Sequence, residues 1–134
     1  MVSFLEFVQQ SYNQRVTAPG GAGGQCVDIP NAYLHVCFNQ AHVWLNAADW
    51  AHTVIPLWTW VKNKPSNFPV PGSIVVWAPN SGHGIGPNGH IDLAVWSDTM
   101  RFVGLDQNWP EGSPCTCVVH DFLGVVGWHT PPRH

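Results

Sequence analysis

The first third of the chain carries apolar side chains at the three- and four-residue spacing of helices. Ser3 and Glu6 have the spacing of a capping box, and the pattern after them predicts a helix over residues 4–13. A second helix is predicted from Cys26 onward, where one apolar stripe recurs; its members are Ile29, Tyr33, Val36 and Cys37. Residues 39–51 are expected to form a further helical segment.

The second half of the chain changes to short runs that are typical of strands. Residues 52–72 mix tryptophans with prolines, which predicts an irregular surface segment. Four β-branched or aromatic runs bounded by Gly, Pro, Asn and Ser follow and predict strands at 73–78, 91–96, 101–105 and 117–120. Helices therefore come first and strands second. This order predicts an α+β fold in which N-terminal helices pack on an antiparallel β-sheet.

A glycine-rich segment, residues 17–24, separates the first two predicted helices and leads into Cys26. Its glycines and proline suit neither a helix nor a strand, so the chain is expected to turn there. The turn places a thiol at a predicted helix N-terminus, where unpaired N–H groups and the helix dipole stabilise an anion. The position predicts a lowered thiol pKa and makes Cys26 a candidate nucleophile.

A predicted hairpin would bring a base and an orienting group together. If residues 90–96 and 100–108 pair around a three-residue loop, period-two alternation puts His90 on one face with Asp106 and Asn108. A register in which paired numbers sum to about 196 or 198 sets His90 opposite Asp106 or Asn108. A shift of one residue would abolish the contact. We expect His90 as general base and then acid, and Asp106 as orienting group with Asn108 as its alternative.

Composition narrows the classes of function. A chain of 134 residues suits one domain, which we expect over residues 1–134. The five Lys and Arg residues are scattered and the net charge is -3, which argues against a nucleic-acid surface. The N-terminal residues show neither a signal peptide nor a membrane span. Four cysteines in a chain this long do not indicate a disulfide scaffold.

Five ordered motifs resemble the CHAP domain family and together cover nearly the whole chain. They are Gly24-Gln25-Cys26-Val27-Asp28, Asn46-Ala47-Ala48-Asp49-Trp50, Pro71-Gly72-Ser73-Ile74-Val75-Val76-Trp77, Gly89-His90-Ile91 and Asp106-Gln107-Asn108-Trp109. Members of this family are papain-like cysteine hydrolases that cut peptidoglycan, as N-acetylmuramoyl-L-alanine amidases or as peptide endopeptidases, and many belong to bacteriophage endolysins. The resemblance implies a papain-like fold, amide cleavage in the cell-wall peptide and no cofactor.

Further expectations concern the oxyanion, the cleft and the setting of the reaction. The Cys26 N–H and a neighbouring donor, either the Gln25 side chain or a loop amide, are expected to stabilise the oxyanion. Trp109 and His83 are expected to flank the substrate cleft. Peptidoglycan is the expected partner of a monomer. Without a signal peptide, a phage enzyme would accumulate in the host cytoplasm and reach the wall through a membrane lesion made by another protein.

Three features depart from the family's pattern. Asp106 stands where the family often has Glu. Asp92 puts a charge in a strand that is usually apolar in these domains. The loop at residues 16–24 lacks the Asp and Glu side chains with which some members bind calcium, so we expect no calcium there.

Alternative readings lead to metal sites or to a binding module. The run Ser81-Gly82-His83-Gly84-Ile85-Gly86 resembles part of a zinc DD-peptidase signature with His83 as a ligand, but the downstream His-x-His is missing. Cys115, Cys117 and His120 are zinc-binding residue types, yet no second pair of ligands stands nearby in the sequence, so no metal is expected. A cell-wall-binding module that stacks exposed tryptophans on sugars would be indifferent to Cys26→Ala.

Overall fold

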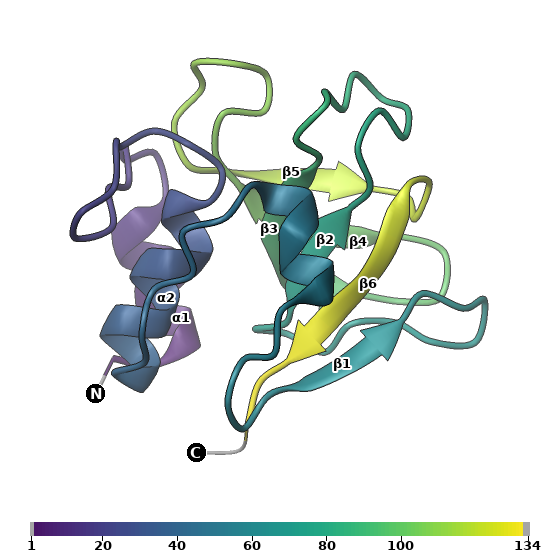
Figure 1. Ribbon diagram of the computed structural model, residues 1–134, viewed down its shortest axis with the longest axis horizontal. Coiled ribbons are helices and arrows are strands. Elements are labelled where there is room, and N and C mark those ends of the chain that lie inside the picture. Colours follow the sequence, from purple (N-terminus) through teal and green to yellow (C-terminus); the bar gives the residue numbers. More distant parts are fainter. Residues whose placement is uncertain (1, 133–134) are drawn as a thin grey trace.

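One six-stranded antiparallel sheet forms the body of the protein, with helices against it (Figure 1). The computed structural model describes residues 2–132, so Met1, Arg133 and His134 of the expected domain lie outside it. The elements are α1 (Phe4–Ser11), α2 (Asp28–Phe38), the 3-10 helix η1 (Ala47–His52), β1 (Thr59–Lys62), β2 (Ile74–Trp77), β3 (His90–Ser97), β4 (Phe102–Asp106), β5 (Thr116–His120) and β6 (Val125–Thr130). The strand order is β1-β6-β2-β3-β4-β5. The predicted α+β fold is confirmed.

Both N-terminal helices form, with ends that differ from the prediction by about one turn or less. In α1 the predicted capping box is present: Ser3 Oγ accepts from the Glu6 N–H at 3.2 Å, and Glu6 Oε1 accepts from the Ser3 N–H at 3.4 Å. Helix α2 begins at Asp28, two residues later than predicted. Pro30 falls in its first turn, where a missing N–H leaves no helical bond unmade. Within the predicted stripe, Val36 is exposed.

The predicted helix over residues 39–51 is wrong for most of its length. Asn39 adopts a left-handed conformation with φ 51° and ends α2. The following segment is held instead by Asn31, whose side chain accepts from the Val43 N–H and donates to the Val43 carbonyl. These bonds replace helical ones, and only η1 is helical in this region.

The predicted irregular segment at residues 52–72 contains a strand that the sequence pattern does not reveal. Strand β1 has only four residues and pairs antiparallel with β6 at the edge of the sheet, Thr59 opposite Thr130. Its short length and the prolines around it hide the period-two pattern, so the pairing with β6 decides its conformation.

The sheet is buried on both faces. The face toward the helices carries Ile74, Val76, Ile91, Leu93 and Leu105, which pack with α2 side chains such as Tyr33 and Leu34. The opposite face carries Val75, Trp77, Ala94, Phe102 and Trp128, and loop residues such as Ile85 and Phe122 cover it. Within residues 2–132, no helix combines the length and the apolar character that a bilayer-spanning segment requires.

The register of the β3–β4 hairpin decides which side chains meet near the site. Leu93 pairs with Leu105 and Ala94 with Gly104, which is one of the two predicted registers. An irregularity after Ala94 then shifts the pairing toward the turn. Continued by one residue toward the site, the register sets Asp92 opposite Asp106 on the face away from the helices.

Candidate active site

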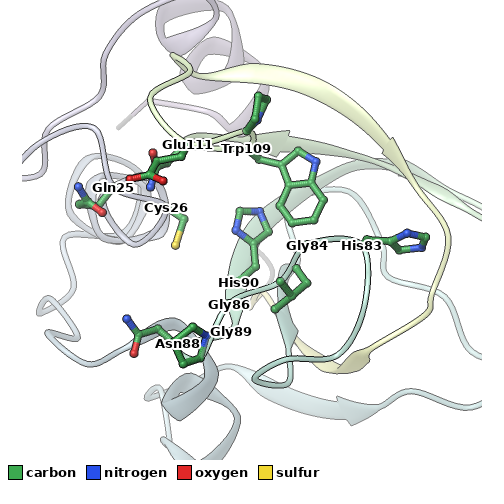
Figure 2. A pocket seen from close by; sticks show the side chains of 14 residues that line it. Gln25, Cys26, His83, Gly84, Gly86, Asn88, Gly89, His90, Trp109 and Glu111 are labelled. Atoms are coloured by element: carbon green, nitrogen blue, oxygen red, sulfur yellow. The ribbon is translucent and has the colours of Figure 1, made fainter.

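One cavity of about 660 Å³ lies where the loop before α2, the segment 83–90 and the segment 108–111 meet. Cys26 and His90 both line it, and the indole of Trp109 lies beside the imidazole (Figure 2). A volume of this size is typical of small-ligand clefts. The cavity therefore brings a thiol and an imidazole from distant parts of the sequence to one open space.

Cys26 is half-buried, two residues before the start of α2. Burial raises the pKa of its thiol to about 11, and the negative charge of Asp106 acts in the same direction. The backbone N–H groups of Ile91 and Val27 favour the thiolate but do not outweigh burial. The direction is the opposite of the lowered pKa that the sequence predicts. Cys26 therefore carries its proton until a base removes it.

Asp28 holds the glycine-rich loop at the start of α2. Its buried carboxylate accepts hydrogen bonds from the backbone N–H groups of Ala18 at 3.0 Å and Gln25 at 3.1 Å. The same two bonds fold the glycine-rich loop back onto the helix.

Gln107 ties the loop of Cys26 to the end of β4. Its fully buried side chain accepts from the Val16 N–H at 2.7 Å and donates to the carbonyls of Val16 at 2.9 Å and Gln25 at 3.0 Å. Sequence patterns predict no role for Gln107, and its place beside Asp106 is the only signal that points to it. The contact couples the candidate nucleophile's loop to the strand that ends at Asp106.

His90 is the first residue of β3 and is almost fully buried. Its Nε2 lies 2.6 Å from Asp106 Oδ2, and its ring packs against Trp109 and Trp77 at centroid distances of 4.8 and 5.1 Å. The preceding Gly89 has φ +74°, a conformation that favours glycine, and a Cβ there would meet the Trp77 carbonyl oxygen. These contacts fix the imidazole with Nδ1 as its remaining hydrogen-bonding atom.

Asn108, the predicted alternative to Asp106, has another partner. Its Oδ1 accepts from the Gly112 N–H at 2.6 Å, and its backbone adopts φ 62°. The residue therefore closes the turn after β4 while it lines the cavity. Of the two candidates for orienting His90, the structure brings Asp106 into hydrogen-bond contact with the imidazole.

The remaining predicted site residues lie at the two ends of the cavity. Gln25 is exposed beside Cys26, and Trp109 covers one side of the imidazole (Figure 2). His83 lines the far end, but its Nε2 lies 3.1 Å from the Asp121 carboxylate and both side chains are about half exposed. His83 is thus engaged by Asp121 rather than directed at Cys26.

A single group of His, Cys, Asp or Glu side chains within residues 2–132 is compact enough for a metal ion: Asp92, Asp106 and His120. His83 belongs to no such group in this range, so the zinc-peptidase alternative finds no ligand set around it. The three grouped side chains already contact one another, and their charges are considered below.

Two other features of the sequence lie apart from the cavity. Cys115 is buried and Cys117 exposed, and Cys115 lies before the start of β5, so strand alternation does not relate the two thiols. Of the eight tryptophans, Trp50, Trp58, Trp77 and Trp128 are buried in the core. Half of the rings that a sugar-binding module would present are therefore inaccessible.

The chain is similar to a known family and to several solved structures. The family match, to the CHAP domain, covers residues 16–108. The crystal structure of endolysin LysIME-EF1 superposes with a TM-score of 0.81 at 23% identity, over 100% of this chain and 66% of that chain. The crystal structure of Ly7917 with the hydrolyzing product of MDP superposes with a TM-score of 0.73 at 20% identity, over 96% of this chain and 61% of that chain. The chain thus spans just under two thirds of the length of these proteins and shares their fold.

Proposed function

Because the chain belongs to the CHAP domain family, we propose that it is a cysteine-dependent peptidoglycan hydrolase that cleaves an amide bond of the cell-wall peptide. One observation carries the proposal: Cys26 and His90 line the same cavity, and His90 is bonded to a buried carboxylate. Two neighbours of the same fold add support from their own descriptions, one as an endolysin and one by its complex with the hydrolyzing product of MDP.

The first half of the proposed reaction transfers an acyl group to sulfur. His90 Nδ1 takes the Cys26 thiol proton as the sulfur attacks the amide carbonyl carbon. Because burial raises the thiol pKa to about 11, the thiol depends on His90 to remove its proton. Asp106 stabilises the positive charge that the imidazole gains. The oxyanion is bound by the Cys26 N–H with the Gln25 side chain or a loop amide.

Collapse of the tetrahedral intermediate completes the exchange of bonds. His90 returns the proton to the leaving nitrogen, the C–N bond breaks, and an amine departs while the acyl group stays on Cys26 as a thioester. His90 then takes a proton from water, whose oxygen attacks the thioester carbon. The carboxylic acid is released and the thiol regains its proton, so the enzyme ends in its starting state.

The proposal also covers the extent of the domain, its oligomeric state, its partner and its place of action. Residues 1–134 act as one catalytic domain, a monomer that needs no cofactor and whose partner is peptidoglycan. The protein acts on the bacterial cell wall. Trp109 and the far end of the cavity near His83 contact the substrate, and the bond that is cut is either that of an amidase or that of an endopeptidase.

Mass spectrometry of digested peptidoglycan tests the proposal. Purified walls are incubated with wild type, with Cys26→Ala and with Cys117→Ala, each with and without EDTA. Cys117 is exposed and outside the cavity, so its substitution controls for the loss of a thiol. New amines should appear with wild type and Cys117→Ala, in EDTA as well, and be absent with Cys26→Ala. The fragment masses then identify the bond.

Three results would contradict the proposal. Cleavage that survives Cys26→Ala but is lost in EDTA would assign the reaction to a metal. Binding to walls without any new amine, equal in wild type and Cys26→Ala, would favour a binding module. Loss of cleavage in both cysteine variants would remove the specific role of Cys26. Circular dichroism of each variant confirms that it is folded.

A further inference from the structure

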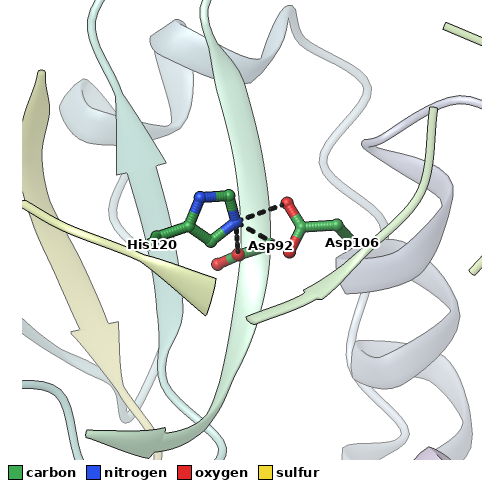
Figure 3. Close-up of side chains that lie close together, drawn as sticks. All are labelled: Asp92, Asp106 and His120. Carbon is green, nitrogen blue, oxygen red and sulfur yellow. Dashed lines mark hydrogen bonds and ion pairs between the residues drawn. The ribbon is translucent and has the colours of Figure 1, made fainter. Parts of the chain in front are cut away.

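Three buried side chains from three neighbouring strands meet on the sheet face away from the helices (Figure 3). His120, the last residue of β5, directs Nε2 at both oxygens of Asp106, 3.0 Å from each. The same nitrogen lies 3.3 Å from Asp92 Oδ2, a distance for an ion pair rather than a well-aligned hydrogen bond. Both carboxylates are completely buried.

The cluster extends directly to the proposed catalytic base. Asp106 Oδ2, one of the two oxygens that His120 contacts, is also the atom that lies 2.6 Å from His90 Nε2. His120 and His90 therefore share one carboxylate from opposite sides. The shared oxygen places the two Nε2 atoms within about 6 Å of each other, close enough for a charge on one ring to affect the other.

The charges of the cluster follow from its contacts. Burial opposes a charged imidazole, but the hydrogen bonds and charges of Asp106 and Asp92 outweigh it and raise the pKa of His120 to about 10. Burial opposes ionisation of Asp106 too, yet bonds from His120, His90 and Asp92 hold its pKa below the usual range. Burial beside that charge raises the pKa of Asp92 well above its usual range. The contacts thus favour a positive charge on His120 and a negative charge on Asp106, while burial favours the uncharged form of Asp92.

A glycine and three aromatic rings pack closely against this cluster. Gly104 faces it from β4, and a Cβ there would overlap Asp92 Oδ2. The rings of Trp77, Phe102 and Trp109 surround the His120 ring at centroid distances of 4.8, 5.2 and 5.5 Å. An apolar wall of this kind strengthens each charge interaction inside it.

We propose that His120 is a positioning residue: as a buried cation it fixes the direction of the Asp106 carboxylate toward His90 and partly neutralises its charge. Asp92, the departure noted in the sequence, is the neutral neighbour that completes the cluster. For the part concerning His90 the inference rests on the proposed function. The contacts among Asp92, Asp106 and His120 stand apart from it.

One consequence concerns the pH dependence of the Cys26 thiol. Removing a nearby cation raises the pKa of every group it faces, so loss of the His120 charge should make Cys26 react at higher pH. Other charged groups beside His120 stay in place and act equally in both proteins; they are Asp121 with its partner His83, and Asp98 and Arg101. The shift therefore isolates the contribution of His120.

The experiment measures alkylation of Cys26 by iodoacetamide against pH, followed by mass spectrometry of the Cys26 peptide. His120→Gln keeps a neutral hydrogen-bond donor, and below about pH 9, where wild-type His120 still carries its charge, it should move the profile upward by roughly one pH unit. Asp92→Asn should move the profile less than His120→Gln, because burial favours the uncharged form of Asp92. His129→Gln is the matched control: His129 is a buried histidine of β6 whose Nε2 bonds the Trp50 carbonyl.

Several outcomes would overturn the proposal. A folded His120→Gln protein with an unshifted profile would leave His120 a purely structural role. Stoichiometric zinc or another divalent ion in the purified wild type, lost in His120→Gln, would make the cluster a metal site. Nitrogen-15 spectra of the wild type apply even if the variant does not fold: both ring nitrogens of His120 should stay protonated at pH 8, and loss of a proton below pH 7 would refute the cation.

Neither measurement uses a wall substrate. A protein that failed to cleave peptidoglycan would contradict the proposed function while the alkylation profile and the spectra still decided the charge of His120. Conversely, an active enzyme with an unshifted His120→Gln profile would keep its function and lose only this inference.

Discussion

His90 and Asp106 form a 2.6 Å hydrogen bond although they do not pair across the hairpin that contains them. The register pairs Leu93 with Leu105, so the residue opposite Asp106 is Asp92 rather than His90. The bond is therefore diagonal and joins the first residue of one strand to the last residue of the next. A short aspartate reaches the imidazole along this diagonal.

Asp106→Asn should lower kcat by about 10²–10⁴-fold, the size seen when the acid of a serine protease triad is made an amide. Asparagine loses the charge that stabilises the imidazolium and favours the wrong ring tautomer. The measurement is the rate of amine release from peptidoglycan. Asn108→Gly is the control, because glycine suits the backbone φ of 62° there, and it should cost less than about tenfold. Equal losses in both variants would refute the different roles of these residues.

Gln107→Ala should lower the free energy of unfolding by about 1–3 kcal/mol, because it leaves the Val16 N–H without a partner and removes one of two hydrogen bonds at each of the Val16 and Gln25 carbonyls. Urea unfolding followed by tryptophan fluorescence measures the change. Asn67→Ala removes an exposed side-chain bond to Lys62 and should change stability by less than about 1 kcal/mol. A Gln107 variant as stable as the Asn67 variant would contradict the coupling of loop and strand.

Gly104→Ala should destabilise the protein by about 3 kcal/mol or more, because the added methyl overlaps the Asp92 carboxylate. Gly86→Ala is the control: nothing lies within 4 Å of its new methyl. Thermal unfolding compares the two. Adding Asp92→Ala to Gly104→Ala should recover a large part of the loss, and failure to do so would place the strain elsewhere.

Stability should fall as pH rises from about 6.5 to 8.5, since the folded-state pKa of His120 is raised from 6.5 to about 10. The folded protein holds a proton that the unfolded chain releases, so this stabilisation is complete below about pH 6.5 and is lost as pH approaches the folded value. Urea unfolding at several pH values should give a shallower decline for His120→Gln. Parallel curves for the two proteins would refute the raised pKa. The pH range from about 6.5 to 8.5 ends below the pKa of about 11 that burial gives the Cys26 and Cys37 thiols.

Local signals predicted much of the fold and part of the candidate site. The capping box at Ser3 and the alternation in the hairpin depend on neighbours within a few residues, and both predictions agree with the structure. The bond between Gln107 and Val16 joins residues 91 positions apart, so no local pattern marks it. Burial is equally invisible in a short motif, which is why the direction of the Cys26 pKa was predicted wrongly.

Asp92 and His120 illustrate the same limit in charged residues. The sequence shows Asp92 as an unexpected acid in an apolar strand, and it shows His120 close to two cysteines. Their pairing requires β3, β4 and β5 to lie in that order in the sheet, which the sequence pattern does not specify. The prediction that no zinc site would form from Cys115, Cys117 and His120 used the absence of a second ligand pair nearby, without knowledge of the partner that His120 has.

The clamp formed by Gln107 separates a braced part of the molecule from an exchangeable wall. It links the loop of Cys26 to β4, so the loop, α2 and the sheet hold Cys26, His90 and Asp106 in place. The segment 83–88 borders the cavity without belonging to that support, whereas Trp109 on the other side packs on the His90 ring. A designer who wants a different substrate preference can therefore transplant the segment 83–88 between relatives as a cassette and leave the clamp untouched.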